Sequence, residues 1–468
     1  MLAWPQSSAR ELARVLKEKG LITQADLNRL EQLDADQSVR LLTSILQDKG
    51  LISGAEAARV QNGVVAQSPP VAPAVVQPPQ RPQAAPPAGE VTSQSKFPVT
   101  LYGTILWNAF SNTAASNNID IPLFASPNVP ETVQNFGMTA RQTRLGLRFQ
   151  GPTIKGAKLS GDVETDFFGG KAALANGVNM DMLRLRLAFG RLDWKNVSLE
   201  AGQDWVIFAP LNPTSFAEYA IPSLSGSGNL WIRAPQIRTE WRHDLDHDRR
   251  FVWQLAALDP NVGDYPIAFA TSRQPQAGEL GRAPAVESRV AFDTPLRGGK
   301  AEVGLSGHWN PAKNVATVGT QILERDFQVW GVALDYNLPF RKWFALSGEI
   351  FGGRGLGIFT GDDGQPYLPP GTPGEHGIGS RGGWMQAQIN WTEKWQTNAA
   401  YGIDAPELQN LVTGSRDKNQ TYMVNLMYKL SPNVTFAWEW RRFLTNYRNQ
   451  AAANNTGNHA NMAIAYTF

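Results

Sequence analysis

The sequence predicts an all-β transmembrane barrel of about sixteen antiparallel strands, with a small N-terminal α-helical module on a Pro-rich linker. From Phe97 to Phe468, segments of roughly 10 residues alternate apolar and polar side chains, which is the period of strands. The links between these segments are alternately short and long. No apolar run approaches the roughly 20 residues of a membrane-spanning helix. We therefore expect strands to supply the membrane crossing.

Composition and charge exclude several classes of protein. The 468 residues carry 43 Lys+Arg against 41 Asp+Glu, which leaves a formal net charge of +2 and no bulk reason to expect a nucleic-acid partner. The absence of cysteine excludes disulfide scaffolds, thiolate zinc sites and cysteine nucleophiles. No G-x-S-x-G, H-E-x-x-H, P-loop or dinucleotide-binding motif is present. We therefore expect no enzyme activity, no cofactor and no metal site.

The N-terminal region, residues 1–66, contains an internal repeat whose two copies begin at Leu16 and Leu46. Each copy has a Lys-Gly helix end followed by a hydroxyl residue with an acidic residue three positions later, as Thr23 and Asp26 illustrate. That spacing is typical of an N-cap, so the repeat predicts two short helical hairpins. They form either a docking or oligomerisation module or a small bundle with no role beyond packing.

A Pro- and Ala-rich linker follows at residues 67–96. Residues 67–90 of this linker, QSPPVAPAVVQPPQRPQAAPPAGE, cannot bury a core and favour an extended, semi-rigid tether. At roughly 3.1 Å per residue, this stretch reaches on the order of 70 Å. The linker therefore separates the helical module from the barrel, which occupies residues 97–468.

Alternation along the predicted strands places charge on one face only. In the segment 143–150, Leu145, Leu147 and Phe149 alternate with arginines, and the segment 183–189 repeats this arrangement with its leucines and Phe189. A soluble β-sandwich also alternates, so periodicity alone does not separate the two folds. An Arg or Lys facing lipid near the midplane costs about 2 to 4 kcal/mol, so in a membrane barrel these charges face the lumen.

The links favour the membrane barrel over the sandwich. Short links near residues 151–157, 191–193, 243–249, 294–299, 339–342 and 431–433 alternate with much longer ones. Outer-membrane barrels have this arrangement, with tight periplasmic turns at one rim and long external loops at the other. An even strand count places both chain ends on the periplasmic side.

Five segments resemble DcaP-type porins of Gram-negative outer membranes. They are TRLGLRFQGP at Thr143, LSGDVETDF at Leu159, AGQDW at Ala201, PQIR at Pro235 and the terminal NMAIAYTF. The resemblance implies a sixteen-stranded barrel, a homotrimer, passage of small anionic solutes such as dicarboxylates, and a C-terminal Phe468 read by the barrel-insertion machinery. One departure is that paired helical repeats stand where those porins have a coiled-coil segment.

The third long link, near residues 206–230, is the predicted constriction, because its prolines and aromatic residues suit a loop folded into the lumen. Its candidate residues are Phe208, Phe216, Glu218 and Tyr219. The candidate pore-lining residues are Arg144, Arg148, Arg184, Arg186, Arg233, Arg238 and Arg242, facing Asp162, Glu164 and Asp166. A guanidinium fork matches two carboxylate or phosphate oxygens, which favours an anion-selective filter. The alternative is a set of cross-strand salt bridges that only solvate the wall.

These observations together predict an outer-membrane porin for passive diffusion of small anionic or polar solutes. The helical module is expected in the periplasm, where it either touches peptidoglycan or stacks in a trimer. His243 and His247 lie among aspartates, but Arg249 stands where a calcium loop needs glycine, so we expect a polar turn. The alternative from another class is a secreted all-β carbohydrate-binding or carbohydrate-active protein with a Pro-rich linker.

Overall fold

The computed structural model describes residues 17, 23–31, 37, 41, 43–45, 97–127, 133–171, 179–246, 248–263, 274–318, 320–359, 367–368, 377–408, 411–449 and 455–468. The chain divides into two compact units, Met1–Val91 and Thr92–Phe468. No helix among the described residues is long and apolar enough to cross a membrane. Each unit is described by itself.

In the first unit, helix α2 spans Gln24–Glu31. The Asp26 backbone N–H donates to Thr23 Oγ1 at 3.2 Å, and the Thr23 backbone N–H donates to Asp26 Oδ2 at 2.9 Å. This reciprocal pair is the cap predicted from the first copy of the repeat, so that prediction is confirmed. The equivalent positions of the second copy, Ser53 and Glu56, lie outside the described residues.

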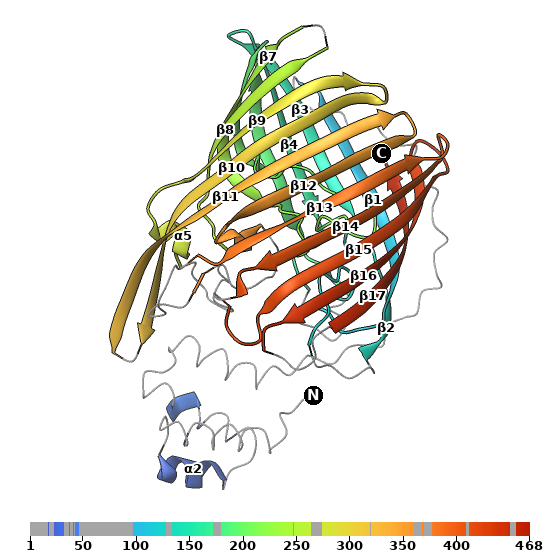
Figure 1. Cartoon of the computed structure of the whole chain (residues 1–468). Coiled ribbons are helices and arrows are strands. Elements are labelled where there is room, and N and C mark those ends of the chain that lie inside the picture. Colours follow the sequence, from blue (N-terminus) through green and yellow to red (C-terminus); the bar gives the residue numbers. More distant parts are fainter. Residues whose placement is uncertain are drawn as a thin grey trace, which may run out of the picture. The chain divides into compact units, whose positions relative to one another are not determined.

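The second unit is a single antiparallel sheet closed into a barrel (Figure 1). Its strands are β1 (Val99–Asn112), β2 (Asn135–Thr139), β3 (Arg144–Ile154), β4 (Ala157–Asp166), β5 (Arg184–Asp193), β6 (Val197–Trp205), β7 (Arg233–Asp244), β8 (Arg250–Leu258), β9 (Ala285–Leu296), β10 (Gly299–Val318), β11 (Gln321–Arg341), β12 (Phe344–Arg354), β13 (Gly379–Asn390), β14 (Trp395–Pro406), β15 (Arg416–Lys429), β16 (Val434–Tyr447) and β17 (Asn455–Thr467). Two short helices, α5 (Ala277–Leu280) and η3 (Leu356–Ile358), lie in the links.

The predicted count of about sixteen strands is confirmed. One edge of β1 pairs with β17, and its other edge pairs with β2 at Asn108–Asn112 and with β3 at Val99–Thr104. Strands β2 and β3 therefore share one position, so the seventeen strands fill sixteen positions around the barrel. Closure pairs every strand except the short β2 on both edges, which removes most of the exposed backbone groups that hydrocarbon does not tolerate.

The links divide between two rims, as the sequence predicts. One rim has seven short turns, at residues 155–156, 194–196, 245–249, 297–298, 342–343, 391–394 and 430–433. The other rim has the long links 113–134, 167–183, 206–232, 259–284 and 355–378. Strands β10 and β11 are exceptions there, because they stay paired out to Val318 and Gln321 and project beyond their neighbours as a hairpin (Figure 1).

The outer surface of the barrel is apolar and the inner surface is polar. Leu101 and Ile105 on β1 are 61% and 51% exposed, whereas the alternating residues Thr104 and Leu106 are buried. On β16, Trp438 and Trp440 are exposed while Glu439 and Arg441 are buried. The described strands all belong to one sheet, so no second sheet covers these rows. A lipid environment is the solvent that suits this outer face.

One face assignment from the sequence is wrong. Leu187 and Phe189 were expected to face outward with Leu185, but they pair with Glu164 and Asp162 of the inner face. The reason is a β-bulge between Glu164 and Thr165, where an extra residue enters β5 and reverses the alternation that follows. Strict period-two counting does not detect such an insertion.

A hydrophobic core lies among the strand ends and the long links. Phe208 is fully buried at its centre, and its ring lies 5.2 Å from Phe359 and 5.8 Å from His308 between ring centroids. The links contribute Val206–Ala209, Leu230, Val262, Ala277, Leu356 and Phe359, and β7–β12 contribute Ala234, Ala256, Leu258, Ala285, Ala312, Phe327, Val329, Ala333 and Phe351. This core, called the link core below, fixes the positions of several links at once.

Candidate functional site

Charged side chains of β3, β4 and β5 interlock on the inner face. Arg148 Nε donates to Asp162 Oδ2 at 3.1 Å, across a register that places the two residues opposite each other. Arg184 Nη2 donates to Asp166 Oδ2 at 2.6 Å. Arg186 reaches Glu164 at 2.6 Å and Asp166 at 2.8 Å. The predicted arginine and carboxylate rows therefore meet, and they meet as ion pairs.

The rows continue on β6 and β7 with residues that the sequence analysis mostly missed. Arg238 contacts Glu200 at 2.9 Å and Asp204 at 2.7 Å. Arg242 contacts Glu240 at 2.6 Å, and Arg191 contacts the same carboxylate at 3.3 Å. A signal was present, because these carboxylates share the alternation of the arginines that had been identified. Asp193 also contacts Arg191, at 3.0 Å.

We call this set the charged wall. It consists of Arg144, Arg148, Arg184, Arg186, Arg191, Arg233, Arg238 and Arg242 with Asp162, Glu164, Asp166, Asp193, Glu200, Asp204 and Glu240. Its members differ in exposure. The Arg148 side chain is 57% exposed, that of Arg184 is 26% exposed, and that of Arg186 is fully buried. Arg148 is therefore the arginine of these three that is most open to solvent.

Two of the predicted arginines have no carboxylate partner within the described part of the chain. Arg144 donates to the Tyr219 carbonyl, and its guanidinium lies 3.5 Å from the Tyr219 ring centroid. Arg233 lies over the rings of Trp205 and Trp231, at 4.6 Å and 5.2 Å. Arg233 is also opposite Trp205 in register, so its alternation differs from that of Arg238. Arg233 therefore belongs to the charged wall through its ring contacts, and its pore-lining role stays a prediction.

The link 206–232, called the inward loop, leaves β6 and crosses to distant strands. The backbone N–H groups of Ile207 and Phe208 donate to Glu287 Oε2 on β9 at 3.0 and 3.1 Å. The Leu211 N–H then donates to Glu349 Oε1 on β12 at 2.6 Å. Carboxylates on the strands thus accept hydrogen bonds from backbone N–H groups of the loop, which have no partner strand.

The second half of the inward loop reaches the opposite strands. Ser215 Oγ donates to Glu439 on β16 at 2.6 Å, and Glu218 forms an ion pair with Arg441 on the same strand. Near β3, Gln142 Oε1 accepts from the Tyr219 and Ala220 N–H groups at 2.7 and 3.0 Å. A segment bonded to β9, β12 and β16 has to cross the interior of the barrel.

The four constriction candidates all lie on this crossing segment. Phe208 is buried in the link core, and Glu218 is buried with Arg441. The rings of Phe216 and Tyr219 lie 5.7 Å apart and pack against a small cluster that includes Leu106 of β1. The loop that the sequence predicts to fold inward crosses the interior, and its role as the constriction stays a prediction. Its partners, such as Glu439 on β16 and Gln142 in the link between β2 and β3, were not identified from the sequence.

A second link also folds inward, which the sequence analysis did not anticipate. Ile121 and Leu123 of the first long link are buried and pack with Ala220 of the inward loop. Asp120 in this link pairs with Arg141, whose Nε donates to it at 2.6 Å. The apolar run IDIPLF at residues 119–124 is the signal that could have revealed this.

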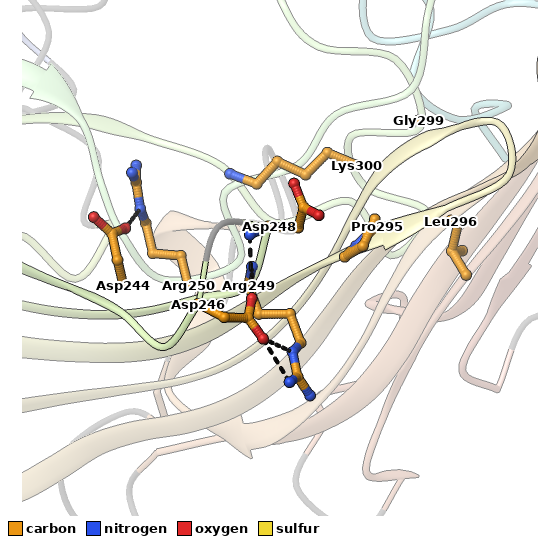
Figure 2. A pocket seen from close by; sticks show the side chains of 9 residues that line it. All are labelled: Asp244, Asp246, Asp248, Arg249, Arg250, Pro295, Leu296, Gly299 and Lys300. Carbon is orange, nitrogen blue, oxygen red and sulfur yellow. Dashed lines mark hydrogen bonds and ion pairs between the residues drawn. The ribbon is translucent and has the colours of Figure 1, made fainter.

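The turn containing His243 and Asp246 is held by an ion pair between Arg249 and Asp246 (Figure 2). Arg249 Nε donates to Asp246 Oδ2 at 2.6 Å, and this hydrogen bond lowers the pKa of the Asp246 carboxyl below its ordinary value. Nowhere in the described part of the chain do three or more potential metal ligands gather. His247 lies outside the described residues.

Comparisons with known proteins bear on the fold. No protein-family model matches the chain, and no curated protein matches it. Among solved structures, the outer membrane channel DcaP of Acinetobacter baumannii matches with a TM-score of 0.60 and 18% identity, covering 80% of this chain and 99% of that one. OprB of Pseudomonas putida matches with a TM-score of 0.49 and 8% identity, over 79% and 94% of the two chains.

The molecule therefore has the fold of an outer-membrane channel of the porin type. Within that class, it is similar to the DcaP channel over nearly the whole length of that protein. The resemblance to DcaP-type porins is confirmed at the level of the fold.

Proposed function

We propose that this protein is a passive diffusion channel of the Gram-negative outer membrane, not an enzyme, and that it is a DcaP-type porin. The closed barrel with an apolar outer face and a charged inner wall supports this proposal. Small hydrophilic solutes would pass along the inner wall, where water replaces lipid. The inward loop would narrow this path.

The proposed preference is for small anions such as dicarboxylates. The charged wall contains eight arginines and seven carboxylates, which leaves one positive charge in excess. Arg144 and Arg233 stack on aromatic rings without a carboxylate, and Arg148 keeps 57% of its side chain exposed. The exposed guanidinium at Arg148 is the observation that carries the proposal, because its fork of donors suits a carboxylate. Since most wall charges are paired, we expect a modest preference.

The same preference is measurable as a reversal potential across a planar bilayer under a salt gradient. Neutralising Arg144 and Arg184 together, as Arg144→Gln with Arg184→Gln, removes two positive charges and should shift the potential towards cations. Arg249→Gln in a short turn is the matched control and should leave the potential unchanged. An unchanged reversal potential in the double variant would refute anion selectivity by the charged wall. The wall arginines would then serve only as structural salt bridges.

The exposed outer face argues against the secreted carbohydrate-binding alternative. Leu101, Ile237 and Ile350 are all more than half exposed, together with rows of tryptophan, and a water-soluble protein gains nothing from such a belt. Extraction separates the two classes. A porin should require detergent and should migrate differently on gels before and after heating, whereas the alternative should dissolve in buffer.

The remaining parts of the proposal concern organisation. We assign residues 1–66 to a periplasmic helical module, 67–96 to the linker and 97–468 to the barrel, with a homotrimer as the assembly. The chain enters β1 at the rim with the short turns, where the Gly103 N–H donates to the Phe468 carbonyl at 3.1 Å. Peptidoglycan is the proposed partner of the module. Failure of residues 1–90, produced alone, to sediment with peptidoglycan would remove that partner.

A further inference from the structure

Three basic side chains lie on the outward face of the barrel, where the alternating residues are otherwise mostly apolar. Each shares the alternation of an exposed residue of its own strand, namely Met385, Tyr422 and Trp440. The three are Arg381 on β13, Lys418 on β15 and Arg442 on β16, called the outward cations below. Two of them, Arg381 and Arg442, are exposed, and Lys418 is half-buried.

Other outward charges on the same side of the barrel neutralise each other. Arg354 at the end of β12 contacts Glu407 at 3.1 Å. On the projecting hairpin, Lys313 of β10 contacts Glu324 of β11 at 3.1 Å. The outward cations differ, because none of their side chains forms an ion pair or hydrogen bond with a residue that the structure describes. Three positive charges on this face therefore lack an anion.

The outward cations lie at the end of the apolar belt that is nearest the rim with the long links. Strands β13 and β15 begin at that rim, and Arg381 and Lys418 are each the third residue of their strand. The exposed rings next to them belong to Tyr401 and Tyr422, with centroids 4.9 Å apart, and Arg442 is opposite Tyr422 in register. Aromatic girdles mark the depth at which a barrel meets the lipid headgroups. Register and girdle together place the outward cations on the membrane side of the wall, at headgroup depth.

Arg381 and Lys418 lie on either side of a small residue. Arg381 is opposite Ala405 of β14. Asp404 is opposite Asn419, and continuing this register by one residue puts Lys418 beside Ala405. Two strand spacings of about 4.8 Å separate the backbones of the two basic residues. Their long side chains can therefore close on one anionic group above Ala405.

An apolar groove of about 590 Å³, called the lipid groove, lies beside these cations on the outward face. Its lining includes Arg381 and the outward side chains of Tyr336, Ile350, Met385, Tyr401 and Ile403. On β12, Gly352 is opposite Arg381 and leaves the adjoining space open, since a Cβ there would meet no atom within 4 Å. An unpaired cation beside an apolar groove suits an amphipathic anion, whose charge contacts Arg381 and whose hydrocarbon occupies the groove.

We propose that Arg381 and Lys418 bind a phosphate monoester of a glycolipid in the leaflet at the long-link rim, and that the lipid groove takes one of its acyl chains. The proposal rests on the outer-membrane location proposed above. A phosphate monoester carries about −1.5 to −2 charges at neutral pH, so it neutralises two cations, whereas the phosphodiester of an ordinary phospholipid carries one charge. A guanidinium fork and a lysine ammonium both suit phosphate oxygens. Arg442 extends the positive surface to the next strand.

The test compares lipid retention by the full-length protein in detergent, using native mass spectrometry after addition of diphosphoryl lipid A or phosphatidylglycerol. Lipid A carries phosphate monoesters and phosphatidylglycerol a diester, so the wild type should retain lipid A in preference. R381Q/K418Q should lower the retention of lipid A by on the order of tenfold or more, since each basic residue near a charged lipid surface contributes roughly fivefold. K155Q/K195Q removes the same charge from two exposed turns at the opposite rim and, as the matched control, should retain lipid A like the wild type.

A second variant tests the groove separately from the charge. G352L keeps every charge but fills the space beside Arg381, so it should also weaken the retention of lipid A. Heat-modifiable migration of each variant checks that the barrel has folded. Full retention by G352L would refute the place given to the acyl chain.

Three other outcomes would overturn the proposal as a whole. The first is equal retention of lipid A by the wild type and R381Q/K418Q. The second is displacement of the lipid by millimolar inorganic phosphate, which would assign the outward cations to a free anion. The third is loss of a trimer in R381Q/K418Q with the bound lipid unchanged, which would assign this face to contact between copies of the chain.

Failure of this proposal is distinguishable from failure of the proposed function. A protein that conducts ions across a planar bilayer but retains no lipid A would refute the lipid site and leave the porin intact. A protein that forms no channel would refute the proposed function instead.

Discussion

The charged wall and the link core lie in one barrel but hold their residues in opposite ways. Around Phe208, apolar side chains from several links pack together and exclude water. Along β3–β7, arginines and carboxylates hold each other in ion pairs while some, such as Arg148, remain exposed. The difference teaches that apolar packing fixes the position of the loops. Ion pairs instead hold charged side chains in place on a surface that stays polar.

The inward loop connects the two regions. Its first residues, Val206–Ala209, belong to the link core, and Tyr219 and Ala220 accept hydrogen bonds from arginines of the charged wall. A change in either region should therefore reach the loop. Apolar packing and ion pairs contribute differently to the free energy of unfolding. The loss of stability caused by a substitution in each region therefore tests the contrast between the link core and the charged wall.

The largest expected effect comes from Phe208→Ala in the link core. Removing a fully buried phenyl ring should lower the free energy of unfolding by about 3 to 5 kcal/mol through lost burial and a new cavity. It should also raise single-channel conductance as the loop loosens. Urea unfolding and planar-bilayer recording measure the two effects. Phe216→Ala, at a half-buried position, is the control. An equal loss of unfolding free energy there would mean that the link core does not stabilise the loop more than other apolar contacts do.

The next effect comes from Arg186→Met in the charged wall. Glu164 loses its main partner in a buried position, so the free energy of unfolding should fall by about 3 kcal/mol, while Asp166 keeps Arg184. The double variant Arg186→Met with Glu164→Gln should recover part of this loss, because it leaves no buried charge unpaired. No recovery in urea unfolding would mean that the cost reflects packing rather than charge.

A smaller effect is expected where the inward loop meets β16. Glu218→Gln weakens the buried contact with Arg441, which keeps Glu439 at 3.2 Å, so the loss should be about 1 to 2 kcal/mol. Fluctuations of the open-channel current should increase as the loop becomes more mobile. The control is Glu302→Gln on β10, whose partner is Arg289 on β9 and not a residue of the inward loop. It should leave these current fluctuations unchanged.

The smallest effect on stability is expected from Arg148→Gln. Its pair with Asp162 is exposed on the arginine side, so the free energy of unfolding should change by less than about 1 kcal/mol. The reversal potential should nevertheless move towards cations, because an exposed charge acts on ions in the lumen. A large loss of stability without a shift in reversal potential would contradict this prediction. Arg148 would then act as a structural residue, like the buried Arg186.

Much of the fold could be predicted because membrane barrels impose a period of two on every strand. Leu145 and Leu147 face outward and Arg144 and Arg148 are on the opposite face, as alternation requires. The prediction failed at Leu187 and Phe189, since a bulge inserts one residue without any local sequence signal. It also missed the burial of Ile121 and Leu123, because their apolar run indicates burial but does not indicate which distant residues they pack against.

The candidate site was predicted in part for the same reason. The arginines, the carboxylates of β4 and the inward loop were identified, since their residue types and alternation are visible in the chain. Arg441 with Glu218, and Gln142 with the backbone of Tyr219, were not, because the partners are separated by 223 and 77 positions. Such pairings arise only when the barrel closes.

The sequence by itself determined the closed sheet, its two rims and, away from the β5 bulge, which strand side chains face water or lipid, because those features follow from local periodicity and from the cost of placing charge in hydrocarbon. Only the tertiary structure decided which charges neutralise each other and where the loops cross the lumen. These outcomes depend on contacts between residues far apart in the chain, and register, bulges and closure set such contacts together.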